Sequence, residues 1–77
     1  MMTQFEQVEV VSSIIEQFNG EIREGAIKRF FDEQMTEYEP HDLTSAEISK
    51  LVKALVDCGL VTIDTFGLLT ITKRREM

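Results

Sequence analysis

The segment from residue 44 to residue 72 constrains the fold most, because it joins a capped amphipathic helix directly to a short hairpin. Thr44-Ser45-Ala46-Glu47 has the pattern of a capping box, in which the threonine hydroxyl and the glutamate carboxylate each bond a backbone N–H at a helix start. Apolar residues then recur every three to four positions, and Gly59 provides the expected C-terminal stop. We therefore expect a helix over residues 44–58. Its predicted buried stripe comprises Ile48, Leu51, Val52, Leu55 and Val56.

The residues after Gly59 alternate between apolar and polar side chains in two short runs, 61–63 and 69–71. Such period-two alternation is typical of strands with one buried face, and Gly67 in the intervening turn suits a tight hairpin. The sequence therefore predicts a hairpin over residues 60–72. The side chains expected to face the helices are Val61, Ile63, Leu69 and Ile71.

Two further helices are expected in the first half of the chain. The apolar residues Phe5, Val8, Val11, Ile14 and Phe18 follow a helical spacing over residues 5–18, which ends at Gly20. A second apolar face comprises Ala26, Ile27, Phe30, Phe31 and Met35, with Lys28, Arg29, Asp32 and Glu33 expected to face water. Residues 21–23 between these helices could add a third, short strand to the hairpin. Residues 36–43, which contain Pro40 and His41, are predicted to form a loop.

A chain of 77 residues with 43% hydrophobic content has the size of one small α+β domain. We expect that domain to cover residues 1–77, with residues 73–77 frayed because they are too polar to be held by burial. Its one cysteine, Cys58, excludes an internal disulfide and is expected to be a small, partly buried residue. No apolar run reaches the length of a membrane span, and we expect a cytoplasmic protein that binds no membrane.

Charge is distributed unevenly along the chain, whose formal net charge is −6. Residues 1–40 carry nine acidic and three basic residues, whereas residues 41–77 carry five of each. Phosphate binding depends on lysine and arginine, so an excess of acids argues against a nucleic-acid partner. The five bases of the second half nevertheless lie on the predicted helix 44–58 and just after the hairpin; they are Lys50, Lys53, Lys73, Arg74 and Arg75.

The order helix, short strand, helix, loop, helix, hairpin resembles the winged helix-turn-helix superfamily, and "AEISKLVKALVDCGLVTID" followed by "GLLTI" looks like its third helix and wing. In the MarR-like regulators of that superfamily the corresponding helix lies in the major groove of DNA. The resemblance therefore implies a DNA-binding protein, a transcriptional regulator with helix 44–58 in the groove. The implied groove-facing residues are Ser45, Glu47, Ser49, Lys50 and Lys53, and the implied phosphate contacts are Lys73, Arg74 and Arg75.

A second interpretation is a non-catalytic winged-helix adaptor or inhibitor that binds a protein with a basic surface through its acidic first half. The long spacing between the second and third helices is similar to that of winged-helix domains in replication-initiator ATPases and cullin-type scaffolds. Helix 44–58 offers two lysines but no Arg, Asn or Gln for bidentate base contacts, and the turn 64–67 carries no base. Phe66 in that turn is a candidate partner contact if its side chain is exposed, and the alternative is that it folds back onto the ribbon. On either interpretation, helix 5–18 is the expected surface of a homodimer.

Motifs for catalysis or for binding of cofactors and metals are missing from the sequence. There is no glycine-rich phosphate loop, nucleophile motif or paired histidine and carboxylate spacing, so we expect no enzymatic activity and no cofactor. His41 has no second histidine or cysteine cluster to complete a zinc site. The acidic pairs 32–33 and 37/39 lack a fixed ligand spacing and are expected to form a solvated surface.

Overall fold

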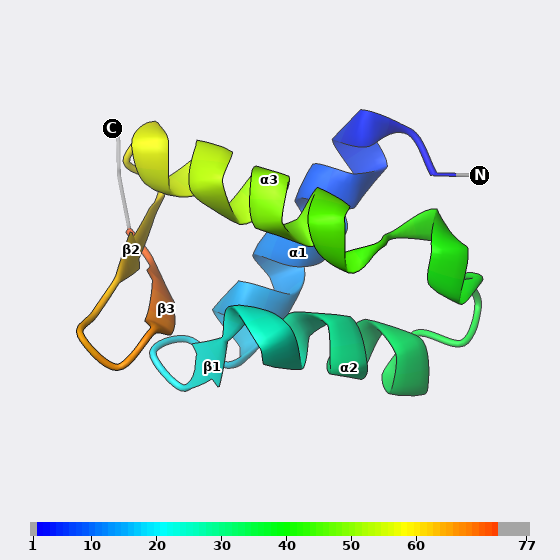
Figure 1. Cartoon of the computed structure of the whole chain (residues 1–77), viewed down its shortest axis with the longest axis horizontal. Coiled ribbons are helices and arrows are strands. Elements are labelled where there is room, and N and C mark those ends of the chain that lie inside the picture. The colour runs from blue at the N-terminus through cyan, green and yellow to red at the C-terminus, as the bar shows by residue number, and fades with distance from the viewer. Residues whose placement is uncertain (1, 73–77) are drawn as a thin grey trace.

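The structure is a computed structural model that describes residues 2–72. Within this range the chain forms three α-helices and three strands, in the order α1 (Gln4–Gln17), β1 (Ile22–Arg23), α2 (Glu24–Gln34), a short 3₁₀ helix η1 (Pro40–Asp42), α3 (Ser45–Asp57), β2 (Val61–Ile63) and β3 (Leu68–Ile71). The strands form one antiparallel sheet in the order β1-β3-β2 (Figure 1). The α+β class, the hairpin and the third strand agree with the sequence prediction, and the layout is consistent with a winged helix.

Local signals account for the ends of α3. The hydroxyl of Thr44 accepts a hydrogen bond from the backbone N–H of Glu47 at 3.2 Å, while the Glu47 carboxylate accepts from the N–H of Thr44 at 2.9 Å. At the other end Cys58 is the C-cap, and Gly59 has a positive φ of 84° that favours glycine. The predicted bounds of 44–58 therefore coincide with the two cap residues.

The three helices enclose an apolar core that also includes the inner face of the sheet. Its largest fully buried side chains include Phe31 of α2, Ile14 and Ile15 of α1, and Ile48 of α3. Leu69 of β3 is also fully buried, and it pairs with both Ile22 and Ile63 across the sheet. The central strand thus connects the hairpin to the helical body.

Three predictions for the first and third helices differ from the structure. Phe5 was expected on the buried stripe of α1 but is 69% exposed, because Met2 joins the core at this end of the molecule and Val10 completes the stripe. α1 also begins one residue earlier than predicted, since Thr3 and Glu6 form a capping box. Cys58 was expected to be partly buried but is exposed, because it lies where α3 has already ended.

The wing, defined as residues 60–72, differs from expectation at Ile63. This side chain was predicted to face the helices, yet it is 51% exposed. The N–H of Leu60 bonds the carbonyl of Leu55, so α3 leads straight into β2 and covers only its first residue, the fully buried Val61. Ile63 lies two residues farther along the ribbon, beyond the helices.

Candidate functional site

The outward side of α3 carries two exposed lysines. Lys53 pairs with Asp57 one turn later, with 3.2 Å between Nζ and Oδ2, and both side chains are largely exposed. Lys50 makes no ion pair with any residue in the range 2–72. Ser45 is exposed at the first position of the helix. One of the two lysines is therefore already partnered by a carboxylate on the same helix face.

The other two residues expected to face a DNA groove lie on opposite flanks of α3. The hydroxyl of Ser49 donates a hydrogen bond to the carboxylate of Glu24 at the start of α2. Glu47 faces α1 instead and borders a surface hollow together with Gln4 and Gln7. The five α3 residues are thus spread around the exposed part of the helix. Lys73, Arg74 and Arg75 lie outside the described residues.

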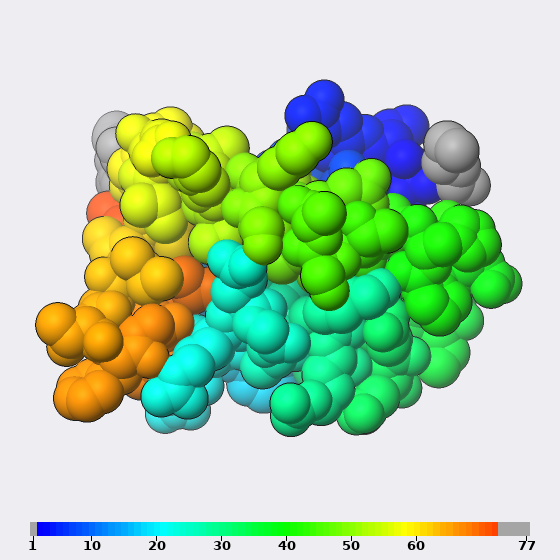
Figure 2. Space-filling view, viewed as in Figure 1, coloured from blue at the N-terminus to red at the C-terminus, as the bar shows by residue number. Residues whose placement is uncertain are grey.

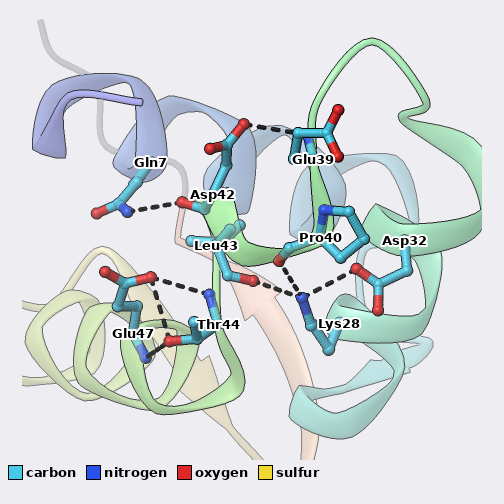
Figure 3. Close-up of polar contacts among 9 residues, drawn as sticks. All are labelled: Gln7, Lys28, Asp32, Glu39, Pro40, Asp42, Leu43, Thr44 and Glu47. Atoms are coloured by element: carbon cyan, nitrogen blue, oxygen red, sulfur yellow. Dashed lines mark hydrogen bonds and ion pairs between the residues drawn. The ribbon is translucent and has the colours of Figure 1, made fainter. Parts of the chain in front are cut away.

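The carboxylate of Glu47 is committed to the start of its own helix. Its Oε1 accepts hydrogen bonds from the backbone N–H of Thr44 at 2.9 Å and from the Thr44 hydroxyl at 3.1 Å (Figure 3). Chiefly because the backbone N–H stabilises the charged form, the pKa of Glu47 is lowered from its ordinary value of 4.5. The negative charge of Glu47 therefore stabilises the N-terminal cap of α3, the helix that was expected to enter the DNA groove.

This lowered pKa predicts a pH-dependent contribution to stability. The unfolded chain holds the Glu47 proton more tightly than the folded chain does, so the contribution is present above pH 4.5 and is lost as the pH falls through the folded-state pKa. We expect the Glu47→Gln variant to be less stable than the original chain near neutral pH. This difference in unfolding free energy, measured by urea denaturation, should shrink below pH 4.5. A difference that stays constant down to about pH 3 would contradict the assignment.

The turn at the tip of the wing is held by hydrogen bonds and presents one exposed aromatic side chain. Asp64 Oδ1 accepts hydrogen bonds at 2.9 Å from the N–H groups of both Phe66 and Leu68, and Gly67 takes a positive φ of 82°. Arg23 Nε donates to the Phe66 carbonyl at 2.7 Å and so ties the turn to β1. The turn projects from the body (orange in Figure 2), and the Phe66 side chain is 71% exposed. Of the two arrangements that the sequence left open for Phe66, the structure has the exposed one.

A second apolar feature is a hollow of about 300 Å³ between the end of α1, β1 and α2. Phe18, Ile22, Ala26 and Phe30 supply its apolar lining, and Glu21, Arg29, Glu33 and Gln34 complete it. This hollow was missed by sequence reasoning, which assigned the aromatic residues to the core. A half-buried phenylalanine has the same helical spacing as a buried one, so periodicity could not have revealed it.

The loop between α2 and α3 is held by Lys28, which was predicted to face water. Its Nζ donates to the carbonyls of Pro40 and Leu43 at 2.6 and 2.8 Å and pairs with Asp32 at 2.9 Å (Figure 3). The Lys28 side chain is only 22% exposed. This cation is therefore part of the structural framework and does not belong to the surface available to a partner.

Residues 2–72 contain no cluster of three His, Cys, Asp or Glu side chains that could hold a metal ion. Within the same range no helix is both long enough and apolar enough to cross a bilayer. His41, the one histidine of the sequence, lies on the short helix η1 with its side chain 79% exposed.

The outward face of α1, the expected dimer surface, is polar apart from one aromatic side chain. The buried side chains of α1, which are Val10, Val11, Ile14 and Ile15, all pack in the core and are not available to a second copy of the chain. Glu9 and Glu16 are exposed, and Phe5 is the one large apolar side chain exposed on this helix among the described residues. Dimerisation through α1 stays a prediction.

Searches against protein-family models, curated proteins and solved structures find no match to this chain.

Proposed function

We propose that this chain is a non-catalytic winged-helix module that binds another protein through its wing, and that the partner presents a basic surface. The observation that carries the proposal is the exposure of two large apolar side chains, Ile63 at the end of β2 and Phe66 in the following turn, which is fixed by hydrogen bonds to the side chains of Asp64 and Arg23. Exposed aromatic and aliphatic side chains on a rigid support are typical anchors of protein interfaces, because little conformational entropy is lost on binding.

The distribution of charge supports a basic partner. Of the three bases in residues 1–40, Lys28 is bound to loop carbonyls and Asp32, and Arg23 is bound to the wing turn. The nine acids of the same half outnumber them threefold. Complementary charge across an interface speeds encounter and excludes wrong partners, so this surface favours a cationic protein over a phosphate backbone.

Affinity capture from an extract of the native host tests the proposal. The tagged chain should retain a specific protein. The Ile63→Ser/Phe66→Ser double variant should capture at least about tenfold less of it, as expected for anchor residues. The matched control is Phe5→Ser, which removes an equally exposed phenylalanine from the opposite end of the molecule (Figure 1). Capture that is unchanged in the double variant, or equally reduced in the control, would contradict the proposal.

DNA binding by a transcriptional regulator is the second candidate, and exposed Lys50 on α3 favours it, because this lysine has no carboxylate partner in the described structure. Phosphate contacts from α3 and from Lys73, Arg74 and Arg75 would make such binding strongly dependent on salt. Fluorescence anisotropy with a random duplex between about 50 and 200 mM salt separates the two candidates. Salt-sensitive binding that is lost in Lys50→Ala/Lys53→Ala would replace the protein-binding proposal.

A further inference from the structure

The hollow beside β1 has the form of a receptor for one apolar side chain. Phe18 and Phe30 form its aromatic part, with ring centroids 5.2 Å apart and planes at 74°, an edge-to-face arrangement. In Figure 1 the contributing segments, the end of α1, β1 and α2, meet along the lower edge of the molecule. The apolar lining therefore comes from three segments that the fold holds together.

A small residue creates the depth of this hollow. Ala26 lies one helical turn before Phe30 on α2, so its short side chain leaves space beside the aromatic ring. Beneath it the core is closed by Ile22 and Ile27, which are 5% and 0% exposed. The hollow is thus a surface feature above a complete core.

Its volume of about 300 Å³ lies at the lower end of the range for small-molecule pockets, roughly 300–1,000 Å³. This space suits a single leucine or phenylalanine side chain better than a nucleotide cofactor. Many protein interfaces derive most of their affinity from one such side chain inserted into a preformed pocket.

The rim of the hollow selects by charge. Glu21 precedes β1 and Glu33 lies on α2, and neither forms an ion pair with another residue in the range 2–72. Arg29 is the one base among the lining residues. The rim is therefore net negative around an apolar floor, which is complementary to an apolar side chain flanked by cationic ones.

We propose that this hollow is a second contact site, which receives one leucine or phenylalanine of a lysine- or arginine-rich segment of the protein partner. The proposal rests on the proposed protein-binding function and specifies the chemistry of the partner. The apolar side chain contacts Phe18, Ala26 and Phe30, while flanking cations lie against Glu21 and Glu33. Arg29 remains available to a backbone carbonyl of the same segment.

The test uses three acetylated and amidated tripeptides, Lys-Phe-Lys, Lys-Ala-Lys and Glu-Phe-Glu, titrated into the full chain labelled with ¹⁵N. We expect Lys-Phe-Lys to shift the amide signals of β1 and the start of α2 in a saturable way, with a dissociation constant on the order of 1 mM. Lys-Ala-Lys, which lacks the ring, should bind about tenfold more weakly or worse, because a buried phenylalanine side chain contributes at least that much free energy. Glu-Phe-Glu, in which the peptide charges are reversed, should bind about fivefold more weakly than Lys-Phe-Lys.

Variants of the chain locate the site. Ala26→Leu should fill the hollow and abolish the shifts, and its own spectrum shows whether it has folded. Glu21→Gln/Glu33→Gln leaves the apolar lining intact and should remove the preference for Lys-Phe-Lys over Glu-Phe-Glu. The matched control is Glu9→Gln/Glu37→Gln, which removes two exposed carboxylates that do not line the hollow and should retain the preference.

Equal binding of all three peptides, shifts confined to the wing, or unchanged binding in a folded Ala26→Leu variant would each overturn this inference. Its failure is distinguishable from failure of the proposed function. If the peptides do not bind at β1 while the wing double variant still loses its captured protein, only the second site is wrong. If the wing variant captures as much protein as the original chain, binding through the wing is wrong, and if the original chain captures no specific protein, the protein-binding function itself is wrong.

Discussion

Replacing Phe31 with alanine is expected to lower the free energy of unfolding by about 3 to 5 kcal/mol. Phe31 is the largest fully buried side chain, and its ring stacks on Tyr38 with centroids 5.7 Å apart. Truncation removes the apolar surface and leaves a cavity between helices that cannot close fully. A domain of this size has a total unfolding free energy of only about 4 to 12 kcal/mol. If the unsubstituted chain lies near the lower end of this range, the variant should be largely unfolded at about 37 °C.

Urea denaturation followed by circular dichroism measures this effect. Phe31→Leu, which retains much of the buried surface, should cost roughly 1 to 2 kcal/mol and so remain folded for comparison. Phe5→Ala is the matched control, because Phe5 is exposed and its removal should change stability by no more than about 0.5 kcal/mol. Equal effects of the Phe31 and Phe5 substitutions would show that the packing described around Phe31 is wrong.

The Lys28→Met variant is expected to lose about 2 to 3 kcal/mol of unfolding free energy. Methionine preserves the length and apolar character of the side chain but leaves the carbonyls of Pro40 and Leu43 without their charged donor. The Leu43 side chain is fully buried, so its carbonyl is poorly placed to find water as a substitute. The variant also loses the ammonium that lies 5.4 Å from the centre of the Phe31 ring.

Hydrogen exchange and urea denaturation together test this role of Lys28. Amides of the loop between α2 and α3 should exchange faster in Lys28→Met, because that loop is anchored by the missing donor. Lys53→Met is the matched control, since Lys53 also forms an i, i+4 ion pair but is 77% exposed. Its substitution should cost no more than about 0.5 kcal/mol. A Lys28→Met variant as stable as Lys53→Met would contradict the anchoring role.

The two functional proposals place contacts on different parts of the fold. The wing presents Ile63 at the end of β2 and Phe66 in the turn, whereas the hollow lies between the end of α1, β1 and α2. Arg23 connects them, because it belongs to β1 and its side chain bonds the carbonyl of Phe66. A partner that contacts both sites would therefore meet two surfaces whose relative position is held by the sheet.

The sequence by itself determined the features that depend on neighbouring residues. The capping box at Thr44 and Glu47, the turn at Gly67 and the alternation around Leu69 each arise within a few positions, so the bounds of α3 and the hairpin could be predicted. The order of the elements suggested a third strand paired with the hairpin, but not that this strand would pair with β3. The position of Phe66 in the wing turn was predictable from the same neighbouring residues, whereas its exposure was not.

Only the tertiary structure decided which apolar side chains are buried and which charged side chains form hydrogen bonds within the protein. Met2 rather than Phe5 closes one end of the core, and Ile63 lies beyond the helices. Lys28 bonds the carbonyls of Pro40 and Leu43 in the loop that follows its own helix. The hollow beside β1 likewise requires Phe18 and Ala26 to meet. Each of these outcomes depends on where segments distant in the sequence come together, and residue spacing within one helix or strand carries no information about that.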